Sequence, residues 1–309
     1  MTEEKTAAGS ARFKRVDALL IVMMVLPLLI CVALKVCFKP ASEGIDISGA
    51  MIYLQVDSFP LQPLIISESQ VNSWGVMISL LGLCLYLTHG LTEKAETKRQ
   101  LIAEWIVEKC ERLVGQNMNS PRYAGFEYLV AAILGLSAFS SLSCLIGLFA
   151  PTGDINVTAG WAVLVFVLVT REKLAGGFLH YLKGFTEPIP VFTPMNCISE
   201  FSLPVSMAFR HYGNVMSGAV ISTLVGAALR ALSRMVLGWI PVVGTIPLLK
   251  IGIPAILSIY FDVFSGLMQA FIFAMLTMLN IAGAFPAEAW EKRQKKKQPR
   301  MAEKAAANA

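Results

Sequence analysis

Residues 201–240 read FSLPVSMAFRHYGNVMSGAVISTLVGAALRALSRMVLGWI. Built as one straight α-helix, this apolar stretch would measure ~55–60 Å, twice the ~30 Å thickness of a membrane's hydrocarbon core. A second stretch of similar length covers residues 249–285. Helices of this length must lie at a steep tilt, which usually arises when packing against something large imposes it. The two stretches therefore predict a membrane protein with a large partner.

The segment that joins the two stretches predicts a turn. Residues 241–247 read PVVGTIP and contain two prolines and a glycine. Proline cannot continue a helix, so the chain must reverse its direction here. We therefore expect residues 201–286 to form one long, strongly tilted helical hairpin.

The composition agrees with a membrane location. Apolar residues make up 55% of the chain, charged residues make up 15%, and the mean hydropathy is +0.62. Soluble domains carry ~25% charged residues. The six cysteines include no C-x-x-C pair, which favours small buried side chains over a disulfide or metal site. The sequence predicts an all-α polytopic membrane protein with about six hydrophobic helices.

The order of apolar and charged segments predicts the organisation of the chain. The expected segments are an N-terminal tail at 1–15, a first transmembrane helix at 16–38, an external segment at 39–70, a second transmembrane helix at 71–91, an amphipathic helix and linker at 92–124, the third and fourth membrane segments at 125–200, the hairpin at 201–286 and a basic tail at 287–309. Positively charged segments favour the cytoplasm. The two tails and residues 92–124 are therefore expected on the cytoplasmic side of the membrane.

Two of these membrane segments have an alternative reading. The run at 16–38 follows basic residues, so a cleaved signal peptide competes with a retained helix; its length, its Lys35 and the lack of a clear cleavage site favour the helix. The run that begins near residue 157 soon reaches Arg171, Glu172 and Lys173. This run crosses the membrane, resuming through Leu182, only if these charges face protein or water.

The charged segment at 92–124 has the pattern of an amphipathic helix. Its apolar side chains recur at helical spacing, and charged side chains occupy the other face. The apolar set is Leu101, Ile102, Trp105, Ile106, Cys110, Leu113 and Val114, and the charged set is Glu104, Glu108, Lys109 and Arg112. Such a helix lies on the membrane surface or against a partner.

Arg210 lies within the long apolar stretch at 201–240. Ser206 precedes it by four residues, and Asn214 and Ser217 follow it by four and seven, so one face of the helix carries a polar stripe. The alternative is an arginine near the interface that snorkels toward water. An arginine keeps its proton near neutral pH, so Arg210 can attract or exclude another charge but cannot relay protons by titrating.

Asp262 and Gln269 lie seven residues apart in the last apolar stretch. In an α-helix this spacing places them on one face, ~10 Å apart. A carboxylate such as Asp262 can accept a proton or a cation from water, although it can also be the structural partner of a neighbouring cation. Gln269 does not titrate, and its expected roles are hydrogen bonding across the hairpin or holding water.

These residues resemble a known family. PVSMAFRHYGNVMSG at 204–218 is similar to the P-x-S-x-x-x-R-x-[FY]-G-N-x-x-[AS]-G signature of subunit a of F-type ATP synthases, and QAFIFAMLT at 269–277 is similar to its Q-A-[YF]-[VI]-F-x-x-L-T motif. PTGDINVT at 151–158 and Pro194-Met195-Asn196 with Glu200 add to the likeness. The likeness covers about residues 68–285.

The resemblance implies a stator subunit that is not catalytic itself and needs no cofactor or metal. Its partners would be a ring of c subunits, the peripheral-stalk b subunits and the rest of a rotary ATP synthase. Two offset half-channels would carry H+ or Na+ to and from the c-ring carboxylates, and Arg210 would prevent a short circuit between them. Asn214, Gln269 and Ser206 would lie in this zone, Glu200 and Asn196 on the cytoplasmic path and Asp262 on the external path.

Five positions depart from the pattern of some or most family members, and they affect its details. Ala219 stands where some members have glutamate, Asp262 where some have histidine and others an acid, Cys144 where asparagine is common, His211 where an apolar residue is usual, and Asn280 where tyrosine is frequent. The motif at 204–218, called here the Arg motif, and the motif at 269–277, called here the Gln motif, keep their defining residues.

Two other classes of function remain to be compared with this hypothesis. A self-contained secondary transporter would use Arg210 and Asp262 to bind its substrate, but we find no internal repeat that favours one. A membrane-bound enzyme lacks support, because no phosphate-binding glycine loop or H-E-x-x-H motif is present. The sequence leaves open which ion is carried and whether the complex mainly makes or hydrolyses ATP.

Overall fold

The computed structural model describes residues 2–38, 49–56, 63–92, 97–118, 120–187, 189–237, 252, 256–257 and 259–291. In this part of the chain, helical segments at Phe13–Phe38, Glu68–Thr88, Phe126–Ile146, Ile155–Leu174, Pro190–Val236 and Ile259–Ala284 are long and apolar enough to cross a membrane. The predicted all-α polytopic fold is confirmed. The turn expected at 241–247 and the basic residues after 291 lie outside the described residues.

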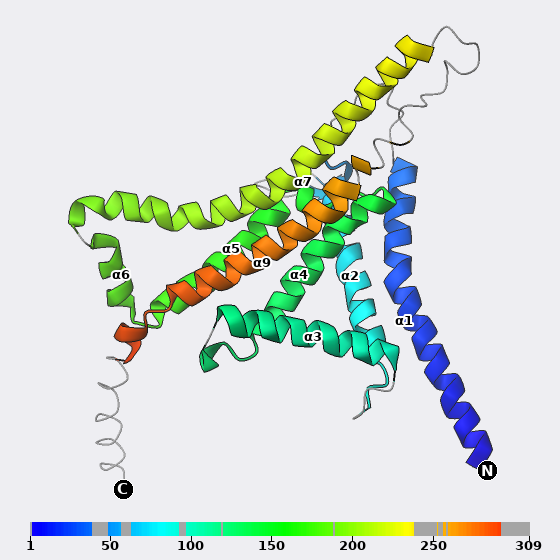
Figure 1. Cartoon of the computed structure of the whole chain (residues 1–309), viewed down its shortest axis with the longest axis horizontal. Helices are drawn as coiled ribbons and strands as arrows, with labels where there is room; N and C mark the ends of the chain where they lie inside the picture. Colours follow the sequence, from blue (N-terminus) through cyan, green and yellow to red (C-terminus); the bar gives the residue numbers. More distant parts are fainter. Residues whose placement is uncertain are drawn as a thin grey trace.

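Helices α1 (Thr2–Phe38) and α2 (Glu68–Thr88) lie side by side (Figure 1). They approach closely at small residues, as membrane helices commonly do. A Cβ atom added to Gly82 would lie 3.0 Å from the backbone nitrogen of Met24. The segment expected as an N-terminal tail continues the first membrane helix without a break, because its Ala, Glu, Lys and Arg residues are good helix formers.

A pair of short strands precedes α2. Strands β1 (Ile52–Val56) and β2 (Leu64–Ser67) are antiparallel, with Ile52 opposite Ser67 and Val56 opposite Leu64. The sequence did not predict these strands. Two such short segments pair only through contacts that form across a loop in the folded chain. Strand β2 leads directly into α2, so it marks one side of the membrane, called here the strand side.

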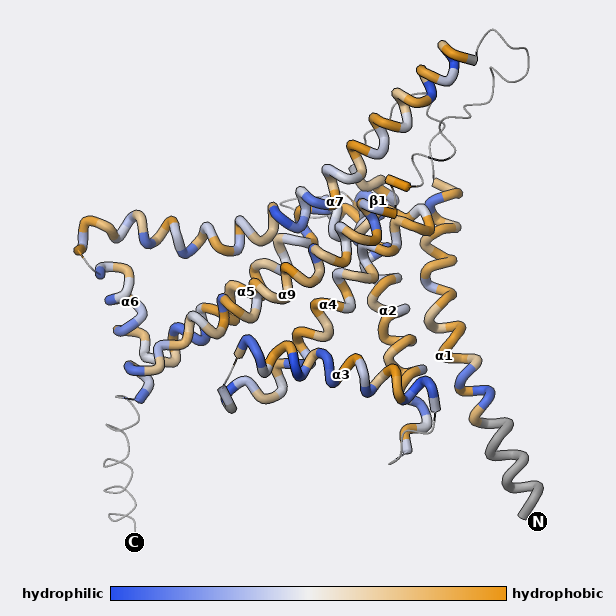
Figure 2. The backbone as a smooth tube through the Cα atoms, in the orientation of Figure 1, coloured by the Kyte–Doolittle hydropathy of each residue, from blue (hydrophilic) through white to orange (hydrophobic). Residues whose placement is uncertain are grey.

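Helix α3 (Lys98–Asn117) marks the opposite side. Figure 1 shows it running across the ends of α2 and α4 rather than alongside them. Its Cys110 and Val114 are buried, whereas Leu101 and Trp105 are exposed. Figure 2 shows hydrophilic and hydrophobic residues mixed along this helix, as the sequence predicts for an amphipathic helix. We call this the α3 side.

The core is formed by α4 (Phe126–Leu142), α5 (Ile155–Leu174), α7 (Thr193–Leu237) and α9 (Gly266–Ala284). Val130, Val165, Phe273 and Met278 are at most 1% exposed there. Short turns η1 (Pro121–Tyr123), η2 (Ser143–Ile146) and η3 (Pro151–Gly153) connect the elements before α5.

Helix α5 ends at Leu174, and the chain does not continue through Leu182 as one span. Gly177 takes φ +110°, a conformation that L side chains rarely adopt, and the short helix α6 (Phe178–Thr186) starts in a new direction. Two of the three charges at the end of α5 are paired with protein groups, and the third, Arg171, is exposed. Arg122 Nε donates to Glu172 Oε2 at 2.8 Å, and Lys173 Nζ donates to Glu200 Oε2 at 2.5 Å.

The turn η4 (Pro190–Phe192) leads into α7, which is 45 residues long and contains Pro204. Figure 1 shows α7 extending well beyond the neighbouring helices, as expected for a helix that exceeds the membrane thickness. The last segment begins with the π-helix η7 (Ile259–Ser265), which leads into α9. The helices α7 and α9 pack on each other and on α5.

Candidate functional site

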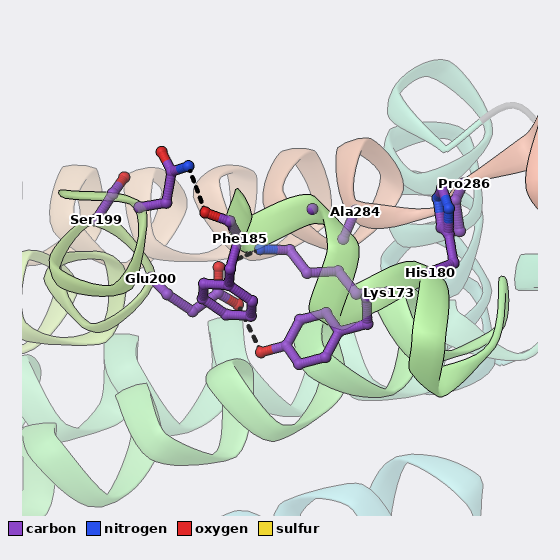
Figure 3. Close-up of a pocket in the computed structure, with 10 residues that line it drawn as sticks. Lys173, His180, Phe185, Ser199, Glu200, Ala284 and Pro286 are labelled. Atoms are coloured by element: carbon purple, nitrogen blue, oxygen red, sulfur yellow. Dashed lines mark hydrogen bonds and ion pairs between the residues drawn. The ribbon is translucent and has the colours of Figure 1, made fainter. Parts of the chain in front are cut away.

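A cavity of about 330 Å³ opens between α5, α6, α7 and the end of α9 (Figure 3). We call it the Glu200 cavity. Its lining includes Lys173, His180, Tyr181, Asn196, Ser199 and Glu200. It lies on the α3 side, because Lys173 follows Glu172, which pairs with Arg122 just after α3.

Glu200 is the central charge of this cavity. Its Oε2 accepts from Lys173, and its Oε1 accepts from the hydroxyl of Tyr181 at 3.5 Å. The Glu200 side chain is only 12% exposed. Burial raises the pKa of Tyr181, and the charge of Glu200 adds to this effect. The cavity thus presents a carboxylate that is held from two sides.

Asn196 lies one helical turn before Glu200 on α7 and orients the neighbouring loop. Its Nδ2 donates to the carbonyl oxygens of Phe185 at 2.9 Å and Glu187 at 3.0 Å. The structure thus brings Asn196 and Glu200 together, although their roles stay predictions. The sequence alone did not identify Lys173 and Tyr181 as partners of Glu200. Helices α5 and α6, which carry them, meet α7 only in the folded chain.

A second cavity, of about 170 Å³, lies on the strand side, and we call it the inner cavity. It is lined from α1, the α4–α5 connection, α7 and η7 by residues that include Lys35, Ser141, Cys144, Phe149, Gly153, Asn214, Ala219 and Asp262. The structure therefore brings Asn214 and Asp262 to one cavity. Asp262 is partly exposed.

An outer cavity of about 660 Å³ adjoins the inner cavity, and Phe149 and Gly153 line both. Its polar lining includes Ser69, Ser73, Asp154 and Asn156. Asp154 caps α5 by accepting from the backbone nitrogen of Asn156 at 2.9 Å, and it also accepts from Ser69 Oγ. Polar groups therefore line a stepwise path from the strand side toward Asp262.

Arg210 lies on α7 between the segments that line these cavities. It follows Glu200 by ten residues, ~15 Å along the helix, and precedes Asn214 by four, ~6 Å. The Arg210 side chain is exposed, as are Val205, Ser206 and Phe209 beside it. Among the described residues we see no hydrogen bond or ion pair to its guanidinium. Ser206 lines neither the Glu200 cavity nor the inner cavity.

Gln269 is separated from Asp262. It is 4% exposed, its Nε2 has no hydrogen-bond partner among the described residues, and it does not line the inner cavity. The sequence analysis expected both residues on one face of an α-helix. Asp262 lies instead in the π-helix η7, whose wider turns change the angle between positions seven residues apart.

His211, beside Arg210, points into the core and not to the exposed face. It is fully buried, its Nε2 lies 3.2 Å from Ser137 Oγ, and its ring packs edge-on against Trp161 and Phe273. The imidazole of His211 therefore has a structural role in the core, next to the position of Arg210 on α7.

Comparison with known proteins shows an extended match. Residues 71–282, more than half of the chain, match the family described as ATP synthase A chain. The chain is similar to the sodium ion specific ATP synthase subunit a of Propionigenium modestum, at 29% identity over 230 residues, which cover 69% of this chain and 72% of the relative.

Two further relatives have higher identity. The ATP synthase subunit a of Bacillus pumilus is 31% identical over 223 residues, covering 67% of this chain and 89% of the relative. The ATP synthase subunit a 1 of Hahella chejuensis is 30% identical over 223 residues, covering 72% and 86%. The family match at residues 71–282 includes the Arg motif, the Gln motif and most of the cavity-lining segments.

Proposed function

Because this chain belongs to the ATP synthase A chain family, we propose that it conducts H+ or Na+ through two offset half-channels beside a ring of c subunits. The resemblance seen in the sequence is confirmed. The chain is a subunit a of the ATP synthase membrane sector, a multi-pass membrane protein whose partners are other subunits of that complex. The ion path and the residues that form it are the proposal.

The observation that carries the proposal is the position of Arg210 between cavities on opposite sides of the membrane. The Glu200 cavity lies on the α3 side, and the inner and outer cavities lie on the strand side. None of the three cavity linings includes Arg210 itself. In the proposed path, an ion leaves the cavity on one side, passes the exposed face of α7 on the rotor and returns to the cavity on the other side.

The exposed face around Arg210 fits an apolar rotor that carries a carboxylate. Large apolar side chains are exposed along α7 and on the η7–α9 segment, which packs on α7. The exposed set is Phe201, Val205, Phe209, Ile221, Ile259, Tyr260, Phe264, Leu267 and Phe271. A fixed cation in this low-dielectric surface attracts a passing carboxylate and repels its ion, so Arg210 separates the two half-channels.

We assign the other predicted residues the following roles, which their positions in the structure support. Glu200, with Asn196, receives or releases ions on the α3 side, and Asp262, with Asn214, does so on the strand side. Gln269 and Ser206 flank the zone between them, Gln269 from the buried side of α9 and Ser206 from the exposed face of α7.

The membrane orientation follows from charge. The basic segments that include α3 favour the cytoplasm, so the α3 side and both termini are placed there in a bacterial cell membrane. The peripheral-stalk b subunits would hold this stator subunit fixed while the rotor turns. One relative is named as sodium ion specific, so Na+ is considered beside H+ as the transported ion.

The test is ATP-driven ion pumping in inverted membrane vesicles that contain the whole complex. Arg210→Ala is expected to abolish coupled pumping and to make the membrane leak ions passively, because nothing then separates the half-channels. Arg234→Ala, which removes the same charge near the end of α7, is the matched control and should pump normally. Unchanged pumping by Arg210→Ala would contradict the proposed role of Arg210 in separating the half-channels. The Na+ dependence of the same assay identifies the ion.

A further inference from the structure

An ion pair joins α1 to α2 at the wall of the inner cavity. Lys35 Nζ lies 3.0 Å from Glu68 Oε1, and the two side chains are 29% and 3% exposed. Both residues precede the segment 71–282 that matches the family. The pair is therefore a feature of this chain's N-terminal region, whose role the sequence left unassigned.

Glu68 is the fixed partner of the pair. It is the first residue of α2, where the partial positive charge of a helix N-terminus stabilises a carboxylate. Its Oε1 also accepts from the backbone nitrogen of Phe149 at 3.4 Å, and its own backbone nitrogen donates to Met51 at 2.7 Å. Contacts from α1, the strand segment and the α4–α5 connection thus fix the position of this carboxylate.

Lys35 is the partner that faces the ion path. It lines the inner cavity together with Asp262 from η7, Cys144 from η2 and Asn214 from α7. An ammonium group that was not neutralised here would repel incoming cations and attract the carboxylate of Asp262. Charge interactions of this kind are strong where water is scarce.

We propose that Glu68 holds Lys35 against the wall of the inner cavity, so that the cavity presents no uncompensated positive charge to the ion that passes Asp262. Lys35 and Glu68 are then positioning residues of the strand-side path, and α1 is part of that path rather than an anchor alone. This inference rests on the proposed function of the chain.

The test compares ion-driven ATP synthesis in liposomes that contain the whole complex, with each rate divided by the amount of assembled complex. Glu68→Gln leaves the lysine unpaired in the path and is expected to lower the rate roughly tenfold, equivalent to ~1.4 kcal/mol. Lys35→Met removes the cation and is expected to keep the rate within about threefold of wild type. The double variant should recover the rate, because neutral replacement of both partners of a buried pair is often tolerated.

Lys109→Met is the matched control, because it removes the same charge from α3, where Lys109 lies 5.8 Å from the ring of Trp105. Its rate should equal that of wild type. A pair that only ties α1 to α2 would lower the amount of complex without changing the rate per complex. A wild-type rate for Glu68→Gln, or a double variant no better than Glu68→Gln, overturns the proposal.

A second measurement does not depend on whether the complex with Glu68→Gln assembles. Lys35→Cys, in a chain whose six native cysteines are replaced by serine, is expected to react with a membrane-impermeant cationic thiol reagent added from the strand side. Leu29→Cys, whose position is 58% exposed on the same helix, should stay unreactive if it faces lipid. Equal reactivity at both positions, or none at Lys35→Cys, overturns the proposal. Coupled pumping by Arg210→Ala would instead overturn the proposed function, so the two failures are distinguishable.

Discussion

Asn214 of α7 and Ser265 at the end of η7 exchange two hydrogen bonds. Ser265 Oγ donates to Asn214 Oδ1 at 2.9 Å, and Asn214 Nδ2 donates to the Ser265 carbonyl oxygen at 3.3 Å. The amide therefore uses both its donor and its acceptor on the same residue. This pairing fixes the long helix against the π-helical turn that carries Asp262, at the wall of the inner cavity.

Asn214→Ala is expected to loosen this junction, because it removes both hydrogen bonds. The loss should amount to about 1–2 kcal/mol of stability, since each hydrogen bond between membrane helices contributes about 0.6 kcal/mol on average and up to about 1.7. Ser265→Ala keeps the carbonyl acceptor and should cost about half as much. Heat inactivation of the purified complex measures both effects. Equal inactivation of the two variants would contradict the paired geometry.

Gly82→Val is expected to separate α1 from α2. The added side chain would meet the Met24 backbone, which cannot move away as a flexible side chain can. Overpacking of this kind costs about 1–3 kcal/mol. Gly160→Val on α5 is the control, because a Cβ at Gly160 meets nothing within 4 Å. Protease sensitivity of the α1–α2 region should rise in the first variant alone.

Arg122→Ala is expected to destabilise the α3 side. Arg122 donates to Glu172, which is largely buried, and its guanidinium carbon lies 4.6 Å from the ring of Phe285. The Arg122 side chain is one-third exposed, so solvent screening lowers the cost to about 1–2 kcal/mol. Arg122→Lys keeps the charge and should recover part of the loss. The amount of assembled complex at raised temperature reports the difference, and a wild-type value for Arg122→Ala would show that the pair contributes no stability.

Tyr181→Phe tests the pH dependence of the Glu200 cavity. Burial, and then the charge of Glu200, raises the pKa of Tyr181, so the phenol ionises more readily in the unfolded chain than in the folded one. The contribution of neutral Tyr181 to the free energy of unfolding is complete below pH ~10, the usual pKa of tyrosine. It is lost as the pH rises through the higher pKa that Tyr181 has in the folded chain. Tyr181→Phe should therefore lose less stability than wild type above pH ~10.

The same variant should pump ions normally near neutral pH. Lys173 still pairs with Glu200 when the hydroxyl is removed, and the phenol is neutral there in any case. Pumping and heat inactivation measured across the alkaline range check both statements. A large loss of pumping near neutral pH would assign Tyr181 a direct part in ion transfer.

Local properties of the sequence predicted much of this protein. Runs of ~20 apolar residues identify membrane helices without knowledge of their neighbours. The extra length of the long helix was visible as the apolar stretch at 201–240, and the Arg210 motif indicated the family before any fold was known. The break between α5 and α6 was less evident, because glycine permits a positive φ without requiring one.

The sequence by itself thus determined the number of membrane helices, the family and the chemical identity of the charges within the membrane. Only the tertiary structure decided which of these charges meet. Glu200 pairs with Lys173, which is 27 residues away, and Asn214 pairs with Ser265, which is 51 residues away. Gln269 is buried in α9, whereas Asp262 lines the inner cavity from a π-helix that the sequence did not predict. Hydropathy is a local property of the chain, whereas ion pairs and cavities depend on how helices pack, and that packing minimises unpaired polar groups over the whole fold.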